Sequence, residues 1–230
     1  MKRVKLFLLA AVLCTSCATS KFLTSDVKSF EITEMLKIEP FSYISLIETG
    51  NNITYSESIS NSTQLVLNES LQLFKGQLRL SSEEIKPINS SEMNILEQEV
   101  NHLIMSAERN RSIEGIQITP FIESLLNASD KRFGLIIVQF GFTRDKGNYR
   151  NQVAKGIGMG IGTAILTMGM VSVYQVSTKA NSTLHAMIVD NKNKNVAFYN
   201  KSVLKDKEPT ERENIIKHLN KVFDNYFWRK

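Results

Sequence analysis

The sequence predicts an α/β protein of the α+β type, with a mixed sheet of about five strands and helices packed on it. An uninterrupted apolar run at residues 134–142 predicts a buried central strand. Residues 184–189 and 196–199 flank a polar connection and predict a hairpin that extends the same sheet. The final segment carries apolar residues at helical spacing, which predicts a C-terminal helix.

Composition and charge restrict the classes of function. The 230 residues suffice for one domain with a proper core. Three positive charges of the formal +5 lie within the first five residues, which leaves +2 for the rest of the chain and gives no reason to expect a nucleic-acid partner. Both cysteines, Cys14 and Cys17, lie near the amino terminus, and the histidines are far apart in the sequence. The body is therefore expected to hold no disulfide, metal or cofactor.

The first 16 residues have the layout of a secretory signal peptide. Residues 1–5 are basic, residues 6–13 form a short apolar stretch, and small residues precede Cys17. The apolar stretch is too short to span a bilayer, which requires about 20 helical residues.

A cysteine just after small residues at the end of such a stretch resembles the lipobox of bacterial lipoproteins. Ser16 fits the position before Cys17, while Cys14 stands where that family usually has Leu. The resemblance implies that the thiol of Cys17 receives a diacylglycerol, that the leader is cut before it, and that the new amino terminus is acylated. It implies a lipid-anchored protein of the outer membrane facing the periplasm, because residues 18–22 lack the Asp and the acidic cluster that redirect other lipoproteins.

Residues 17–39 are expected to form the lipidated cysteine and a tether, and residues 40–230 a single domain. In the front half of the domain we expect strands at 43–48 and 78–80 and a helix at 58–74 ended by Gly76. A long helix starting after Asn89 and a short one starting at Pro120 follow.

A glycine-rich segment without charged residues, 156–174, has three interpretations. The spacing of its glycines does not match a nucleotide-binding loop. Small residues four apart also permit close helix contacts in lipid. The favoured interpretation is a structural insertion, a loose helix or loop followed by a lead into the hairpin, that is covered by the body or by a partner. The residues expected to contact a membrane or partner are Gly156, Gly158, Gly160, Gly162, Met168 and Met170.

The carboxyl-terminal helix has an expected start signal. Thr210 and Glu213 have the spacing of a capping box, in which each side chain accepts a hydrogen bond from the backbone amide of the other residue. His102 and His185 are interpreted as ordinary helix and strand residues and not as ligands.

The order of elements behind a lipobox resembles outer-membrane lipoproteins with an anticodon-binding-domain-like fold, including the curli-secretion channel lipoprotein family. The residues that carry the resemblance are 135–142, 184–190, 196–199 and the final helix. The glycine segment departs from the amphipathic membrane hairpin of the channel family, and Pro40-Phe41 precedes the first strand instead of following it.

Three functions compete at this point. The first is a non-enzymatic accessory lipoprotein that binds another envelope component, since no nucleophile, base and orienting acid converge in the sequence. The second is a homo-oligomeric, membrane-inserting or pore-associated assembly that uses residues 156–174. The third is an enzyme with pocket residues in the loop after the central strand, Arg144, Asp145 and Tyr149.

Overall fold

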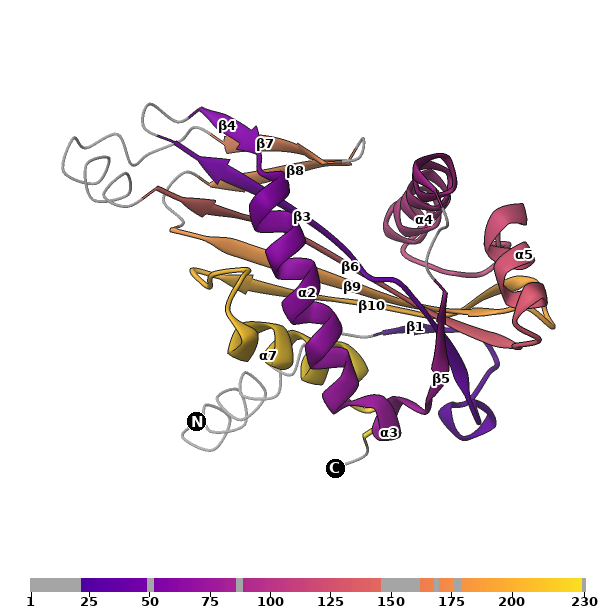
Figure 1. The fold of residues 1–230 in the computed structure, drawn as a ribbon. Coiled ribbons are helices and arrows are strands. Elements are labelled where there is room, and N and C mark those ends of the chain that lie inside the picture. Colours follow the sequence, from indigo (N-terminus) through magenta and orange to yellow (C-terminus); the bar gives the residue numbers. More distant parts are fainter. Residues whose placement is uncertain are drawn as a thin grey trace, which may run out of the picture.

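The computed structural model describes residues 22–48, 52–85, 89–145, 162–167, 170–175 and 179–228. Within these residues a mixed sheet of eight strands lies between two layers of helices, and residues 162–167 and 170–175 form a separate two-stranded sheet (Figure 1). The predicted α+β class with a mixed sheet is therefore confirmed.

The centre of the sheet is β6 (Phe133–Arg144), the apolar run from which a central strand was predicted. It pairs antiparallel with β9 (Asn181–Asp190) along one edge. Along its other edge it pairs in parallel with β2 (Met35–Ile38) and then β3 (Phe41–Ile47). Strands pair with β6 along both of its edges, and helices cover both of its faces. This explains why its first ten residues are all buried.

The sheet has more strands than the approximately five that were expected. The hairpin β9–β10 (β10, Asn195–Lys205) is confirmed, and β1 (Leu23–Thr24) adds an edge strand beside β10. The strand expected at residues 43–48 is β3, and the separate strand β2 precedes it. Pro40 lies between the two strands, because proline has no backbone N–H to donate to a strand ladder. On the far side, β5 (Leu80–Ile85) pairs with β2 and β4 (Ile53–Tyr55) pairs with β3.

Alternate residues of the sheet bury against different helices. One face packs on α2 (Glu57–Leu73) and α7 (Arg212–Phe223), and the other on α4 (Ser90–Asn110) and α5 (Pro120–Ala128) (Figure 1). In β9 the side chains of Leu184, Ala186 and Ile188 enter the first core, whereas those of Met187 and Val189 enter the second. This division accounts for the apolar residues that the sequence shows on both faces of the hairpin.

The helices begin near the predicted positions. Asn89 caps α4 by accepting a hydrogen bond from the amide of Glu92 at 2.9 Å, and Pro120 occupies the first turn of α5. The buried residues of α4 recur at helical spacing and form one apolar stripe, which is Leu96, Val100, Leu103, Ile104 and Ala107.

Two local predictions are wrong. Gly76 does not end a helix, because it lies within the short helix α3 (Lys75–Leu78), which buries Leu78; the strand follows at Leu80. The capping box at Thr210 does not form: α7 begins at Arg212 with Glu211 as its N-cap and without a side-chain cap. Instead Asn214 donates to the carbonyl of Glu208 at 3.0 Å, so a helix residue holds the preceding loop.

The segment expected to be a tether contributes to the packed body from residue 22 onward. Phe22 contacts the rings of Phe198 and Tyr226, and after the short 3-10 turn η2 (Ser29–Glu31), β2 is buried along its whole length. Leu36 is fully buried, whereas Phe30 is 68 % exposed.

The described residues of the glycine-rich segment form strands, and not the loose helix or loop that was expected at its start. Strand β7 (Gly162–Thr167) pairs antiparallel with β8 (Met170–Gln175). Gly162 and Met170 begin these strands, while Gly156, Gly158, Gly160 and Met168 lie outside the described residues. Glycine lowers helix stability by roughly 1 kcal/mol per residue, and the β-branched and aromatic residues of 171–174 favour a strand.

Gly141 is the more tightly packed of the two glycines in β6 and provides a test of the fold. A Cβ atom there would lie 2.5 Å from the carbonyl oxygen of Asn181 and 3.1 Å from Cβ of Pro209. We expect Gly141→Ala to lower the free energy of unfolding by about 1–3 kcal/mol, the usual cost of overpacking. Gly76→Ala is the matched control, because a Cβ atom at Gly76 meets nothing within 4 Å. Urea denaturation measures both, and equal stability of the two variants would contradict this packing.

Candidate functional site

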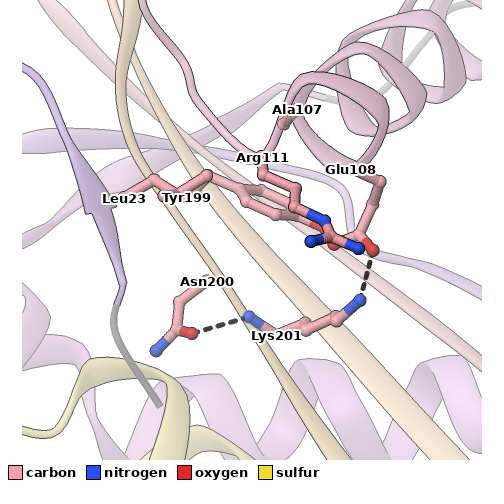
Figure 2. A pocket seen from close by; sticks show the side chains of 7 residues that line it. All are labelled: Leu23, Ala107, Glu108, Arg111, Tyr199, Asn200 and Lys201. Carbon is pink, nitrogen blue, oxygen red and sulfur yellow. Dashed lines mark hydrogen bonds and ion pairs between the residues drawn. The ribbon is translucent and has the colours of Figure 1, made fainter. Parts of the chain in front are cut away.

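A pocket of about 400 Å³ lies where the end of α4 meets the edge of the sheet. Figure 2 shows its walls: β10 on one side, the last turn of α4 on the other, and β1 nearby. Three separate parts of the chain therefore build it. The lining residues are Leu23, Ala107, Glu108, Arg111, Tyr199, Asn200 and Lys201.

Glu108 is the centre of the polar groups in this pocket. Its Oε1 accepts a hydrogen bond from the hydroxyl of Tyr199 at 2.5 Å, and its Oε2 forms an ion pair with the ammonium of Lys201. Partial burial acts to raise the pKa of the carboxyl, but the hydrogen bonds from Lys201 and Tyr199 outweigh burial and hold the pKa below 4.5. Glu108 is thus an ionised group at neutral pH that ties α4 to β10.

His185 lies behind Tyr199 and completes a hydrogen-bonded chain. Its Nδ1 is 2.7 Å from the hydroxyl oxygen of Tyr199, and burial lowers the pKa of the imidazole to about 4. Tyr199 has a single hydroxyl hydrogen, which it donates to Glu108. The neutral imidazole must therefore carry its hydrogen on Nδ1 and donate it to Tyr199. The direction of the chain is from His185 to Tyr199 to Glu108.

A row of rings supports this chain from within the sheet. Tyr43 stacks on Phe140 at 5.5 Å, Phe140 meets His185 edge-on at 5.5 Å, and His185 lies 6.1 Å from Tyr199. These four residues come from β3, β6, β9 and β10, so the row crosses the sheet and ends at the pocket. Such packing restricts the rotamers of His185 and Tyr199 and keeps the floor of the pocket rigid.

Arg111 supplies the available charge of the pocket. It is the C-cap residue of α4, with a left-handed φ of 50°, and its side chain is exposed. Its guanidinium has no hydrogen-bond or ion-pair partner among the described residues, although Figure 2 shows it on the same side of the pocket as the Glu108 carboxylate. Since Glu108 is balanced by Lys201, and His185 and Tyr199 are neutral, the pocket carries one net positive charge. Arrangements of this kind bind anions.

A second polar cluster lies on the other face of β9 and has no access to solvent. Nε2 of His218 is 2.9 Å from Oγ of Ser182, and Nε2 of Gln139 donates to the same oxygen at 3.0 Å. His218 and Ser182 are each 0 % exposed, and burial lowers the pKa of His218 to about 3. Nδ1 of His218 has no partner among the described residues, so no acid orients the ring. A serine and a histidine in contact do not make a hydrolytic site when substrate cannot reach them.

The pocket residues differ from those expected from the sequence. Arg144 and Asp145 lie at the end of β6, where Arg144 covers the ring of Phe142 and the amide of Asp145 bonds to Ile47; they do not line the pocket. Tyr149 and Cys17 lie outside the described residues. His102 is an exposed helix residue and His185 a strand residue, as predicted. Within the described ranges, no three His, Cys, Asp or Glu side chains cluster as a metal site would require.

The residues predicted from the sequence did not include Glu108, Arg111, Tyr199 or Lys201, although two spacings pointed to them. Glu108 and Arg111 are three apart, which places them on one face of a helix, and Tyr199 and Lys201 are two apart, which places them on one face of a strand. Neither spacing shows that the two faces meet. That contact depends on how α4 crosses the sheet.

The two buried histidines predict a loss of stability in mild acid. Burial lowers the pKa of His185 to about 4 and that of His218 to about 3 in the folded protein, from the ordinary histidine value of 6.5. The unfolded chain therefore binds more protons between pH 6.5 and 4, and stability is complete above pH 6.5 and falls as the pH drops through that window. We expect each histidine to contribute up to about 1.4 kcal/mol per pH unit to this slope.

Urea midpoints measured from pH 7 to 5 test this, since most carboxyl groups titrate lower. His185→Gln should reduce the slope, and His102→Gln, which removes an exposed imidazole, should leave it unchanged. A flat profile for the wild-type chain would contradict the burial of both imidazoles.

Comparisons with known proteins leave the family open. No family model and no curated protein matches the sequence. Among solved structures, the PelC dodecamer from Paraburkholderia phytofirmans has a TM-score of 0.37 and 8 % identity, over 90 % of this chain and 95 % of that chain. A single-substitution variant of the same PelC has a TM-score of 0.33 and 8 % identity, over 87 % and 90 %. These scores are too low for an inference about this chain.

Proposed function

We propose that this chain is a lipid-anchored protein of the cell envelope that works without catalysis, as a binding or assembly accessory for another envelope component. The observation that carries the proposal is Cys17, placed directly after a basic and apolar leader. Acylation of its thiol and of the new amino terminus would supply more than one hydrocarbon chain, and stable anchoring requires that. The absence of a redirecting Asp after Cys17 supports placement in the outer membrane, facing the periplasm.

The start of the packed body is consistent with an anchor at this position. Phe22 already contacts Phe198 and Tyr226, so only residues 18–21 separate Cys17 from the body. Among the described helices, none combines the length and the apolar character that a membrane crossing needs. An anchor at Cys17 would therefore hold the β1 edge of the sheet close to the membrane surface.

A binding role fits the chemistry of the polar groups better than a catalytic one. The Ser182–His218 pair is enclosed, and the pocket at the end of α4 offers cations and an ion-paired carboxylate without a serine, cysteine or threonine nucleophile in its lining. Charged groups of this kind recognise a partner group and do not by themselves transform it.

The anchor has a direct test in the intact mass of the mature protein. We expect the wild-type chain to begin at Cys17 and to carry the added mass of acyl chains, and Cys17→Ser to lack that mass. Cys14→Ser is the matched control, because residue 14 is removed with the leader and the mature mass should not change. An unmodified thiol at Cys17, or an uncut leader in the wild type, would refute the anchor.

A second candidate is an oligomeric assembly that inserts residues 156–174 into the bilayer. The observation in its favour is the β7–β8 hairpin, whose residues 162–175 include no charged residue. Backbone groups that enter lipid must be hydrogen-bonded, and a paired hairpin satisfies part of that requirement.

Cross-strand pairs of the hairpin provide the test. Ala164 lies opposite Val173, and Thr163 lies opposite Tyr174, on the other face. If one face contacts lipid or a second copy, introducing Asp at both positions of one pair should abolish the oligomer, and the same change at the other pair should not. Light scattering of the detergent-solubilised protein measures this, and a strictly monomeric wild type would eliminate the assembly.

A further inference from the structure

The pocket at the end of α4 offers more free hydrogen-bond donors than acceptors. Each oxygen of Glu108 already accepts one bond, one from Tyr199 and the other from Lys201. In the side chain of Asn200, Nδ2 donates to the carbonyl of Val222 and Oδ1 accepts from the amide of Lys201. Most of the remaining donors are the five N–H groups on the fork of Arg111 and the two other hydrogens of the Lys201 ammonium, and both groups are positively charged.

These donors match a phosphate group. The planar guanidinium binds phosphate through two parallel hydrogen bonds, and an ammonium adds a point charge beside it. The volume of about 400 Å³ leaves room for the organic part of a ligand, and the partly exposed side chain of Leu23 offers it an apolar wall. Lys201 is held in place by Glu108, and its side chain remains 44 % exposed, so it can contact a ligand without losing its partner.

The position of the pocket along the chain indicates the source of the phosphate. Leu23 lines the pocket and is six residues after Cys17. Six fully extended residues reach at most about 22 Å. If Cys17 is acylated, the pocket is confined to this distance from the bilayer surface, where the phosphates of lipid headgroups are concentrated.

We propose that this pocket binds the phosphate of a membrane phospholipid headgroup, with Arg111 and Lys201 as the contacting side chains. The proposal rests on the acylation of Cys17, which places the pocket at the bilayer. The bound headgroup would orient the body on the membrane surface, so that the acyl chains hold the protein there and the pocket sets which face points toward the lipid.

Native mass spectrometry of the full mature protein in a nonionic detergent tests the proposal. Phosphatidylglycerol, a diacylglycerol with the same acyl chains, and inorganic phosphate are titrated separately. We expect one phosphatidylglycerol per chain, no diacylglycerol at the same concentration, and competition by inorganic phosphate only at far higher concentration. Arg111→Gln should weaken phosphatidylglycerol binding by about tenfold or more, as expected for the loss of a charge-assisted hydrogen bond.

Arg109→Gln is the matched control. Arg109 is an exposed arginine two positions away on the same helix, and it does not line the pocket. Its replacement removes the same charge and should change the affinity by less than about twofold, because exposed charges act weakly in salt. Thermal unfolding of both variants confirms that each is folded.

The possible outcomes are distinct. Equal losses for Arg111→Gln and Arg109→Gln would show non-specific attraction and overturn the proposal. Binding of inorganic phosphate but not phosphatidylglycerol would also overturn it, since the ligand would then be a soluble anion. The mass of the unliganded protein in the same spectrum reports whether Cys17 is acylated. A failure of the anchor is therefore visible separately from a failure of the pocket.

Discussion

The structure depends on β6 being hydrogen-bonded along both edges and covered on both faces. It lies between β9 on one side and β2 and β3 on the other, with helices packed against each face. No position on its first ten residues is open to water, so apolar side chains are favoured at nearly every one. Where a polar residue does occur, as at Gln139, its partners lie inside the protein: the side-chain nitrogen donates to Oγ of Ser182 and to the carbonyl of Pro209.

Successive side chains of β9 face opposite sides of the sheet, so its polar residues lie against two different helix layers. Ser182 faces α7 and is enclosed with His218, whereas His185 faces α4 and is linked through Tyr199 to Glu108. Both histidines are neutral in the folded state because burial lowers their pKa. The difference between the two clusters lies in access. The first is sealed by packed side chains, and the second opens at the sheet edge, where β10 is followed only by the two-residue strand β1.

That edge joins the two proposals made for this chain. β1 is the first described strand after Cys17, and its Leu23 forms part of the pocket wall. An anchor at Cys17 and a phosphate-binding pocket at Arg111 would act at the same end of the molecule. The acyl chains would supply affinity for the bilayer without direction, since hydrophobic burial is not directional, while directional hydrogen bonds from Arg111 would supply orientation.

The sequence by itself determined the central strand, the hairpin and the main helices. Each of these depends on local pattern: the apolar run of 134–142, the alternation around 184–199, and the stripe of α4 from Leu96 to Ala107. Local pattern failed where a distant contact decides the outcome. Gly76 lies inside a helix because Leu78 is buried in the core, and Thr210 caps nothing because Asn214 holds the loop.

Only the tertiary structure decided the pocket. Glu108 and Tyr199 are 91 positions apart, and they meet because α4 and β10 belong to the same packed face. Periodicity assigns a residue to a face of its own element, but it holds no information on which other element that face will meet. The glycine-rich segment shows the same limit, since the pairing of residues 162–167 with 170–175 is a relation between two strands and not a property of either.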